Sequence, residues 1–242
     1  MHTHRSVKVT LPKLLVIAAG STHPEVVRSC GDYDAWFRRA LPDGESRCET
    51  VSPFAGDDLP DPSRYGGAII TGSPASVRDE APWMARVAAW ALAAADAGVA
   101  VLGVCFGHQL LGEALGGRVE PSPKSRELGT IDVHLTEEGR ADPLFAGLPA
   151  TLRVQSTHGD ELAQGPDPSR AVRLAGNDHS RWQAFAAGPR IRAVQFHPES
   201  TEAILRRVLE AHGQGAPIDE TGHGLAILRN WDRHFVRVAG EA

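Results

Sequence analysis

The stretch VLGVCFGHQLLGEALGG, residues 101–117, decides the fold because it contains an apolar strand-like run that is followed directly by a helix-like run. The turn, GVCFG at residues 103–107, places one cysteine between two glycines. Glycines here let the chain bend sharply and let another group approach closely. A buried strand that enters a helix through a tight turn is typical of parallel α/β sheets. We therefore predict such a sheet, with Cys105 at the end of one strand.

The chain before this stretch repeats the alternation of strand and helix. Strand-like and helix-like runs follow in the order strand 14–20, helix 21–41, strands 48–54 and 65–74, and helix 81–98. The last helix is rich in alanine, has Pro82 in its first turn and stops at Gly98. Short connections between such elements favour parallel pairing. The predicted fold class is α/β, with a doubly wound, mainly parallel, flavodoxin-like central sheet flanked by helices.

The remainder of the chain differs in its pattern. Closely spaced strand-like runs with few helices between them predict an added antiparallel section, at residues 129–139, 151–162, 171–177, 181–188 and 190–197. Helical patterns return at 200–213 and 223–238. There is no internal repeat and no convincing linker, so we expect a single domain over residues 1–242, with 205–242 as C-terminal capping helices.

Composition excludes several classes of protein. The formal net charge of −5 gives no overall attraction to nucleic acid or anionic lipid. No apolar run is long enough to span a bilayer, and the first residues lack a signal-peptide pattern. The three cysteines, Cys30, Cys48 and Cys105, form no C-x-x-C pair, which argues against a disulfide framework and a thiolate zinc site. We expect a cytoplasmic protein that binds neither nucleic acid nor a membrane.

The turn around Cys105 has the mechanics of a nucleophile elbow, with sulfur in place of a serine oxygen. The helix begins just after the sulfur, so the positive end of its dipole stabilises negative charge there. The backbone N–H of Phe106, the next residue, is placed to donate to an oxyanion. The alternative is a buried cysteine in a glycine-rich packing corner, since free cysteine is among the most buried residue types. The turn alone does not decide between them.

A cysteine nucleophile needs a base and a group that orients the base. His197 stands out among the eleven histidines because it ends the apolar run IRAVQF and is followed by Pro198 and Glu199. Proline prevents further strand pairing, so the imidazole is expected at a strand tip, where α/β sheets place their sites. Glu199 is near enough to hold the ring in one tautomer. The alternative is a turn with a local ion pair.

Four blocks of sequence, in order between residues 14 and 210, carry a resemblance. They are IITGSPASVRDEAPWM at 69–84, GVCFGHQLLGEALGG at 103–117, SRELGTIDV with VQSTHGDEL, and AVQFHPES at 193–200. Together they resemble the class I (triad-type) glutamine amidotransferase family, in its GMP-synthase-like and γ-glutamyl-peptidase-like branch. The resemblance implies that Cys105 is the nucleophile, His197 the general base and acid, and Glu199 the orienting carboxylate. It also implies that Gly72 and Phe106 supply the oxyanion N–H groups.

The same resemblance makes Gln109, Thr157 and His158 candidate substrate contacts, although Thr157 and His158 could equally form a strand-end turn. The implied reaction is hydrolysis of the side-chain amide of glutamine through a γ-glutamyl thioester, with water releasing glutamate. This half-reaction needs no metal and no organic cofactor.

Three functions stay open on the sequence alone. The chain has no G-x-x-x-x-G-K-[ST] phosphate loop to activate an ammonia acceptor. The ammonia would then pass to a separate synthase subunit, or the protein would be a free-standing hydrolase of γ-glutamyl amides or peptides. A non-catalytic binding module on the same fold is the third alternative, and the intact Cys105, His197 and Glu199 argue against it.

Overall fold

The computed structural model describes residues 11–236. Its strands are β1 Leu14–Ile17, β2 Cys48–Val51, β3 Gly67–Ile70, β4 Ala100–Val104, β5 Arg118–Pro121, β6 Glu127–Leu135, β7 Thr151–His158, β8 Asp160–Gln164, β9 Val172–Gly176, β10 Ala184–Ala187 and β11 Ile191–Val194. Its helices are α1 Pro24–Cys30, α2 Tyr33–Ala40, α3 Gly44–Arg47, α4 Pro82–Asp96, α5 Phe106–Ala114, α6 Glu137–Ala141, α7 Glu202–Ala211 and α8 His223–Phe235.

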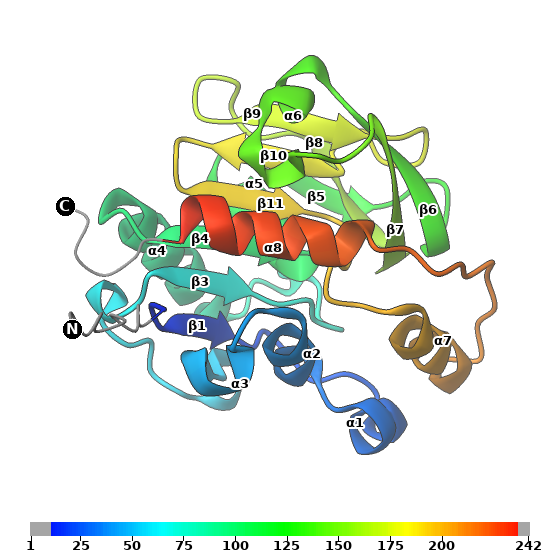
Figure 1. Ribbon diagram of the computed structural model, residues 1–242, viewed down its shortest axis with the longest axis horizontal. Helices are drawn as coiled ribbons and strands as arrows, with labels where there is room; N and C mark the ends of the chain where they lie inside the picture. Colours follow the sequence, from blue (N-terminus) through cyan, green and yellow to red (C-terminus); the bar gives the residue numbers. More distant parts are fainter. Residues whose placement is uncertain (1–10, 237–242) are drawn as a thin grey trace, which may run out of the picture.

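A nine-stranded sheet forms the centre of the molecule, in the order β2-β1-β3-β4-β11-β10-β9-β6-β7 (Figure 1). The strands from β2 to β11 in this order pair in parallel, and the strands from β11 to β7 pair antiparallel. The predicted parallel sheet with an added antiparallel section is confirmed. β11 is the junction, since it pairs parallel with β4 on one side and antiparallel with β10 on the other.

The parallel strands are buried on both faces, as their continuous apolar runs require. Every residue of β1, β3, β4 and β11 is buried. Alternate residues of β1 belong to separate cores: Leu14 packs with Trp231 of α8, and Leu15 packs with Ala91 of α4. In Figure 1, α8 crosses one face of the sheet, whereas α4 and α5 lie behind it. The sheet is thus covered by helices on both sides.

The C-terminal helices lie in different places. α8 is amphipathic and buries Ile227, Leu228 and Trp231 against the sheet. α7 packs instead against α1 and α2, where Ile204 and Val208 contact the small core around Trp36. Residues 237–242 of the expected capping segment lie outside the described residues. In the part of the chain that the structure describes, no helix combines the length and the apolar character needed to cross a membrane.

Candidate active site

Cys105 lies in the sharp turn between β4 and α5, as the sequence predicts. Its backbone has φ 51° and ψ −99°, a conformation that residues with a side chain rarely adopt. The Cys105 amide donates to Val194 O at 2.9 Å, which ties the turn to the neighbouring strand β11. Backbone strain of this kind costs on the order of 1–3 kcal/mol and persists where the surroundings enforce it, often at functional sites.

The flanking glycines let three backbones pack closely around the turn. A Cβ atom on Gly107 would lie 2.4 Å from the carbonyl oxygen of Ile70 in β3. A Cβ on Gly103 would lie 2.6 Å from the carbonyl oxygen of Gly107. Because both obstacles are backbone atoms, no side-chain movement could relieve the clash. The glycines of the GVCFG turn are therefore required for the first turn of α5 to sit against β3 and β4.

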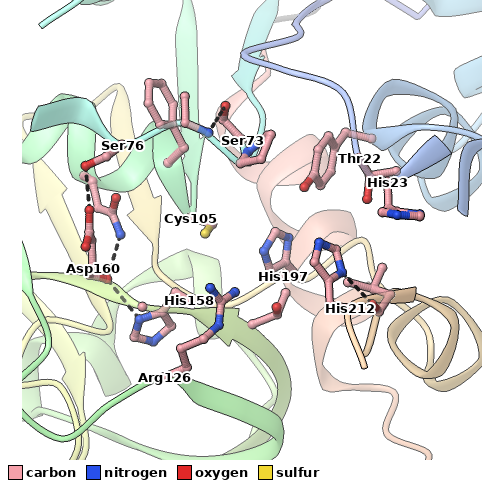
Figure 2. Close-up of a pocket in the computed structure, with 18 of the residues that line it drawn as sticks. Thr22, His23, Ser73, Ser76, Cys105, Arg126, His158, Asp160, His197 and His212 are labelled. Carbon is pink, nitrogen blue, oxygen red and sulfur yellow. Dashed lines mark hydrogen bonds between the residues drawn. The ribbon is translucent and has the colours of Figure 1, made fainter. Parts of the chain in front are cut away.

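His197 faces Cys105 across the ends of two adjacent parallel strands. β4 and β11 pair with Val104 opposite Val194, so the chain past β11 runs alongside the cysteine. The side chains of Cys105 and His197 border the same cavity (Figure 2). The structure brings together the two groups that the sequence analysis paired.

Glu199 holds the other side of the His197 ring. Nδ1 of His197 lies 2.7 Å from Oε1 of Glu199, and the two residues are 4% and 1% exposed. Burial would lower the pKa of His197, but the charges of Glu199 and Cys105 and the hydrogen bond with Glu199 raise this pKa well above its usual value. The imidazolium form is thus favoured between a carboxylate and a sulfur that can carry negative charge.

Tyr33 is a member of this group that the sequence analysis missed. Its ring lies nearly parallel to that of His197, with 6.3 Å between centroids and 16° between planes. Asp32 caps α2 by accepting from the Tyr33 amide at 2.9 Å, and it also accepts from the Thr22 amide at 2.9 Å. Burial, together with the nearby Cys105, raises the pKa of the Tyr33 hydroxyl, so the phenol stays neutral. Asp32 before a helical run is a visible capping signal, but nothing in the sequence indicates the stack.

These groups open into a cavity of about 460 Å³ (Figure 2). This volume lies in the range of small-molecule sites, about 300–1,000 Å³. The walls come from several separate segments: Thr22, His23, Tyr33, Ser73, Pro74, Ala75, Ser76, Arg78, Cys105, Phe106, Gln109, Arg126, Thr157, His158, Gly159, Asp160, His197, Val208 and His212.

The two expected oxyanion donors both lie beside the candidate catalytic groups. Phe106 lines the cavity as the first residue of α5, and its amide has no backbone acceptor among the described residues. Gly72 lies directly against His197: a Cβ there would be 2.7 Å from the ring Cε1. Ser73, which follows Gly72, lines the cavity. The role of Gly72 as a donor remains a prediction, and Ser73 is a neighbour that the sequence analysis did not consider.

The three expected substrate contacts all line the cavity, but two of them are already engaged. Gln109 donates through Nε2 to the Asp160 carbonyl at 2.8 Å and to Gln195 Oε1 at 3.1 Å. His158 is 3% exposed, with Nδ1 at 3.0 Å from the Asp160 carbonyl. Thr157 is less buried and lies next to His158 at the end of β7.

Glu127, which the sequence analysis also missed, holds the imidazole of His158 in place by contacting its Nε2 atom. Its Oε2 lies 2.7 Å from His158 Nε2 and accepts from Gln183 at 2.7 Å, while Oε1 accepts from Asn177 at 2.7 Å. Burial raises the pKa of Glu127, but His158 and the two amides outweigh burial and hold it below its usual value. His158 is thus held in one orientation by a buried carboxylate. Within residues 11–236, no group of three or more His, Cys, Asp or Glu side chains is arranged to hold a metal ion.

Comparison with known proteins identifies the family. The family model for class-I glutamine amidotransferases matches residues 48–210, which is more than half of the chain, and the protein belongs to this family. The chain is 38% identical over 143 residues to a GMP synthase (glutamine-hydrolyzing) from Thermomicrobium roseum, covering 59% of this chain and 25% of that one. It is 26% identical over 156 residues to gamma-glutamyl peptidase 3 from Arabidopsis thaliana, covering 63% and 62%.

Solved structures share the fold. A glutamine amidotransferase from Methylobacillus flagellatus aligns with a TM-score of 0.71 and 21% identity, over 94% of this chain and 93% of that one. A glutamine amidotransferase from Thermotoga maritima aligns with a TM-score of 0.64 and 21% identity, over 83% of this chain and 82% of that one.

The chain spans only about a quarter of the length of the GMP synthase relative, because the alignment covers 25% of that protein. The family resemblance expected from the sequence is confirmed.

Proposed function

We propose that the protein hydrolyses γ-glutamyl amide bonds through Cys105, His197 and Glu199. The observation that carries the proposal is a set of three buried groups: a strained cysteine, an imidazole that borders the same cavity, and a carboxylate 2.7 Å from Nδ1 of that imidazole. A nucleophile, a base and a group that orients the base make up the arrangement needed for acyl transfer.

The reaction proceeds in two halves. The Cys105 thiolate attacks the γ-carbonyl carbon, and backbone N–H groups of Phe106 and Gly72 hold the negative charge on the carbonyl oxygen. The imidazolium of His197 protonates the departing nitrogen as the C–N bond breaks, which leaves a γ-glutamyl thioester. The neutral imidazole then takes a proton from water, the hydroxide attacks the thioester, and the thiolate and glutamate are released. The raised pKa of His197 suits the first half, because the ring holds the proton that the leaving group needs.

Glutamine is the proposed substrate, with ammonia passing to a separate synthase subunit. Support comes from the family and from the likeness to the glutamine-hydrolyzing GMP synthase of Thermomicrobium roseum. The second candidate is a free-standing hydrolase of γ-glutamyl peptides. Its support is the likeness to gamma-glutamyl peptidase 3, of which this chain covers 62%, a far larger share than of the GMP synthase.

The proposal is tested by measuring glutamate released from glutamine and from γ-glutamyl dipeptides by the purified protein. Cys105→Ala should abolish release from every substrate that the native protein uses. Cys30→Ala is the matched control, because Cys30 is free and only partly buried in α1 and should tolerate the change. Full activity of Cys105→Ala would contradict the role of Cys105 as the nucleophile, and inertness of the native protein toward all substrates would favour the non-catalytic module.

The synthase partner needs a separate test. Basal glutaminase activity that rises several-fold when extract of the source cells is added would support a partner subunit. Turnover unaffected by extract, with γ-glutamyl peptides strongly preferred, would support the free-standing hydrolase.

A further inference from the structure

Arg126 places an unpaired positive charge at the mouth of the cavity. It lies in the turn between β5 and β6 and is exposed at the cavity wall. No carboxylate within residues 11–236 forms an ion pair with it. Figure 2 shows its guanidinium group reaching up between His158 and His197, toward Cys105.

The local backbone leaves room for this orientation. A Cβ atom on Gly159 would meet the Arg126 Cγ at 3.4 Å and Nη1 at 3.7 Å. The arginine side chain therefore lies within van der Waals reach of Gly159.

The arginine and acidic side chains on the cavity wall leave one positive charge without a negative partner, which a ligand with no net charge would not neutralise. Asp160 is the only acidic residue among the described residues that line the cavity, and Arg78 already pairs with it, with Nε 3.3 Å from Oδ2. Arg126 therefore has no acidic partner on the cavity wall. Glutamine carries one carboxylate and one ammonium group and has no net charge, whereas a γ-glutamyl peptide adds the carboxylate of its leaving group. A cavity with an excess cation favours the second kind of ligand.

The position of Arg126 matches the leaving group rather than the glutamyl group. The γ-carbonyl must reach Cys105, which is only 7% exposed, so the glutamyl portion enters the deep part of the cavity. The departing nitrogen must face His197, which protonates it. A residue attached to this nitrogen then extends past His197 toward the mouth, where the Arg126 guanidinium lies (Figure 2).

We propose that Arg126 binds the carboxylate of the leaving residue of a γ-glutamyl peptide, so that peptides with a free carboxyl terminus are preferred to their amides, which favours the second candidate substrate over glutamine. This inference rests on the proposed hydrolysis at Cys105. The reaction consumes one water: the C–N bond of the γ-glutamyl peptide breaks, the leaving amine takes a proton through His197, and the glutamyl carbonyl takes the hydroxide. Arg126 takes no part in bond breaking and acts as a specificity-determining residue.

The test compares three substrates: γ-glutamylalanine, the same dipeptide with its terminal carboxylate converted to an amide, and glutamine. Glutamate release gives kcat/KM for each. The native protein should prefer the acid to its amide by roughly tenfold to a hundredfold, the value of a hydrogen bond between charged groups. Arg126→Gln should remove most of this preference and leave the amide dipeptide and glutamine nearly unchanged.

Lys124→Gln is the matched control. Lys124 is exposed in the same turn and carries the same charge, but it contacts the Asp178 carbonyl and does not line the cavity. The Lys124→Gln variant should show the same ratio of kcat/KM for the acid and amide dipeptides as the native protein. An equal loss in Arg126→Gln for all three substrates would overturn the inference, because the arginine would then bind the glutamyl carboxylate. An unchanged ratio in Arg126→Gln would overturn it too. Release of glutamate from none of the three substrates would contradict the proposed hydrolysis itself.

Discussion

Tyr33 and His197 lie with their rings nearly parallel, 16° between planes and 6.3 Å between centroids. The stack joins the start of α2 to the segment that follows β11, two parts of the chain far apart in the sequence. Burial alone would lower the pKa of His197, and the charges of Glu199 and Cys105 oppose this effect. An aromatic face next to a cation stabilises the charged form, so we predict that the Tyr33 ring also favours the imidazolium of His197.

The Tyr33 stack predicts different results for two substitutions. Tyr33→Leu removes the ring and should lower the pKa of His197. Tyr33→Phe keeps the ring and should leave the pKa nearly unchanged. NMR titration of the His197 ring protons measures this directly. Equal pKa values in the native protein and Tyr33→Leu would show that the stack is packing only.

Glu199 should control both the rate and its pH dependence. Glu199→Gln keeps the shape but removes the charge that raises the pKa of His197. His197 would then lose its proton at lower pH, so the high-pH limb of kcat/KM should move to lower pH. The maximal rate should fall on the order of 10²- to 10⁴-fold, as for loss of an orienting carboxylate. Glu202→Gln, at an exposed glutamate on α7, is the control and should leave the profile unchanged. A pH profile of Glu199→Gln equal to the native one would contradict the role of Glu199.

The elbow glycines should tolerate no side chain. Gly107→Ala brings a Cβ to 2.4 Å from the Ile70 carbonyl oxygen, which belongs to the backbone of β3. We expect a loss of roughly 1–3 kcal/mol in the free energy of unfolding, with reduced activity because the Cys105 turn must shift. Gly222→Ala is the control, since a Cβ there has no atom within 4 Å. Urea denaturation compares the two, and equal stability would disprove the close-packing argument.

The buried pair of Glu127 and His158 predicts a stability effect that depends on pH. Glu127→Ala leaves His158 without its 2.7 Å hydrogen-bond partner and should cost about 1–3 kcal/mol near neutral pH. The folded-state pKa of Glu127 is below its usual value, so its contribution is present above the unfolded-state pKa of about 4.3 and is lost as pH falls through the folded-state pKa. Urea denaturation near pH 7 and near pH 3 should show the gap between native protein and variant shrinking in acid. A gap that stays constant would be inconsistent with stabilisation by a buried carboxylate.

Short-range patterns were enough to predict the fold class and to single out Cys105 and His197 as candidates. The glycines beside Cys105 and the proline after His197 mark positions where the backbone must turn, and each of these signals lies within a few residues of the group it places. The order of the sheet then brings the two strand ends together. Cys105 and His197 lie far apart in the sequence and meet because β4 and β11 are adjacent in the sheet, a pairing that no local pattern reveals.

Tyr33, Glu127 and Arg126 were not predicted, and the reason is physical. Each acts through a partner on another element: Tyr33 through His197, Glu127 through His158, and Arg126 through the cavity above Gly159. A tyrosine after a capping aspartate, or an acidic residue at the start of a strand, is common in sequences with no such role. Only the packed structure distinguishes these residues from ordinary ones.

The central claim is that Cys105 attacks the γ-carbonyl of a glutamyl substrate. The most direct measurement is mass spectrometry of the intact protein and its peptides after reaction with a chloroketone analogue of glutamine. One adduct should form, on Cys105, and excess glutamine or γ-glutamyl peptide should slow its formation. Labelling of Cys30 or Cys48 with Cys105 unmodified, or labelling of Cys105 that substrate does not slow, would contradict the account.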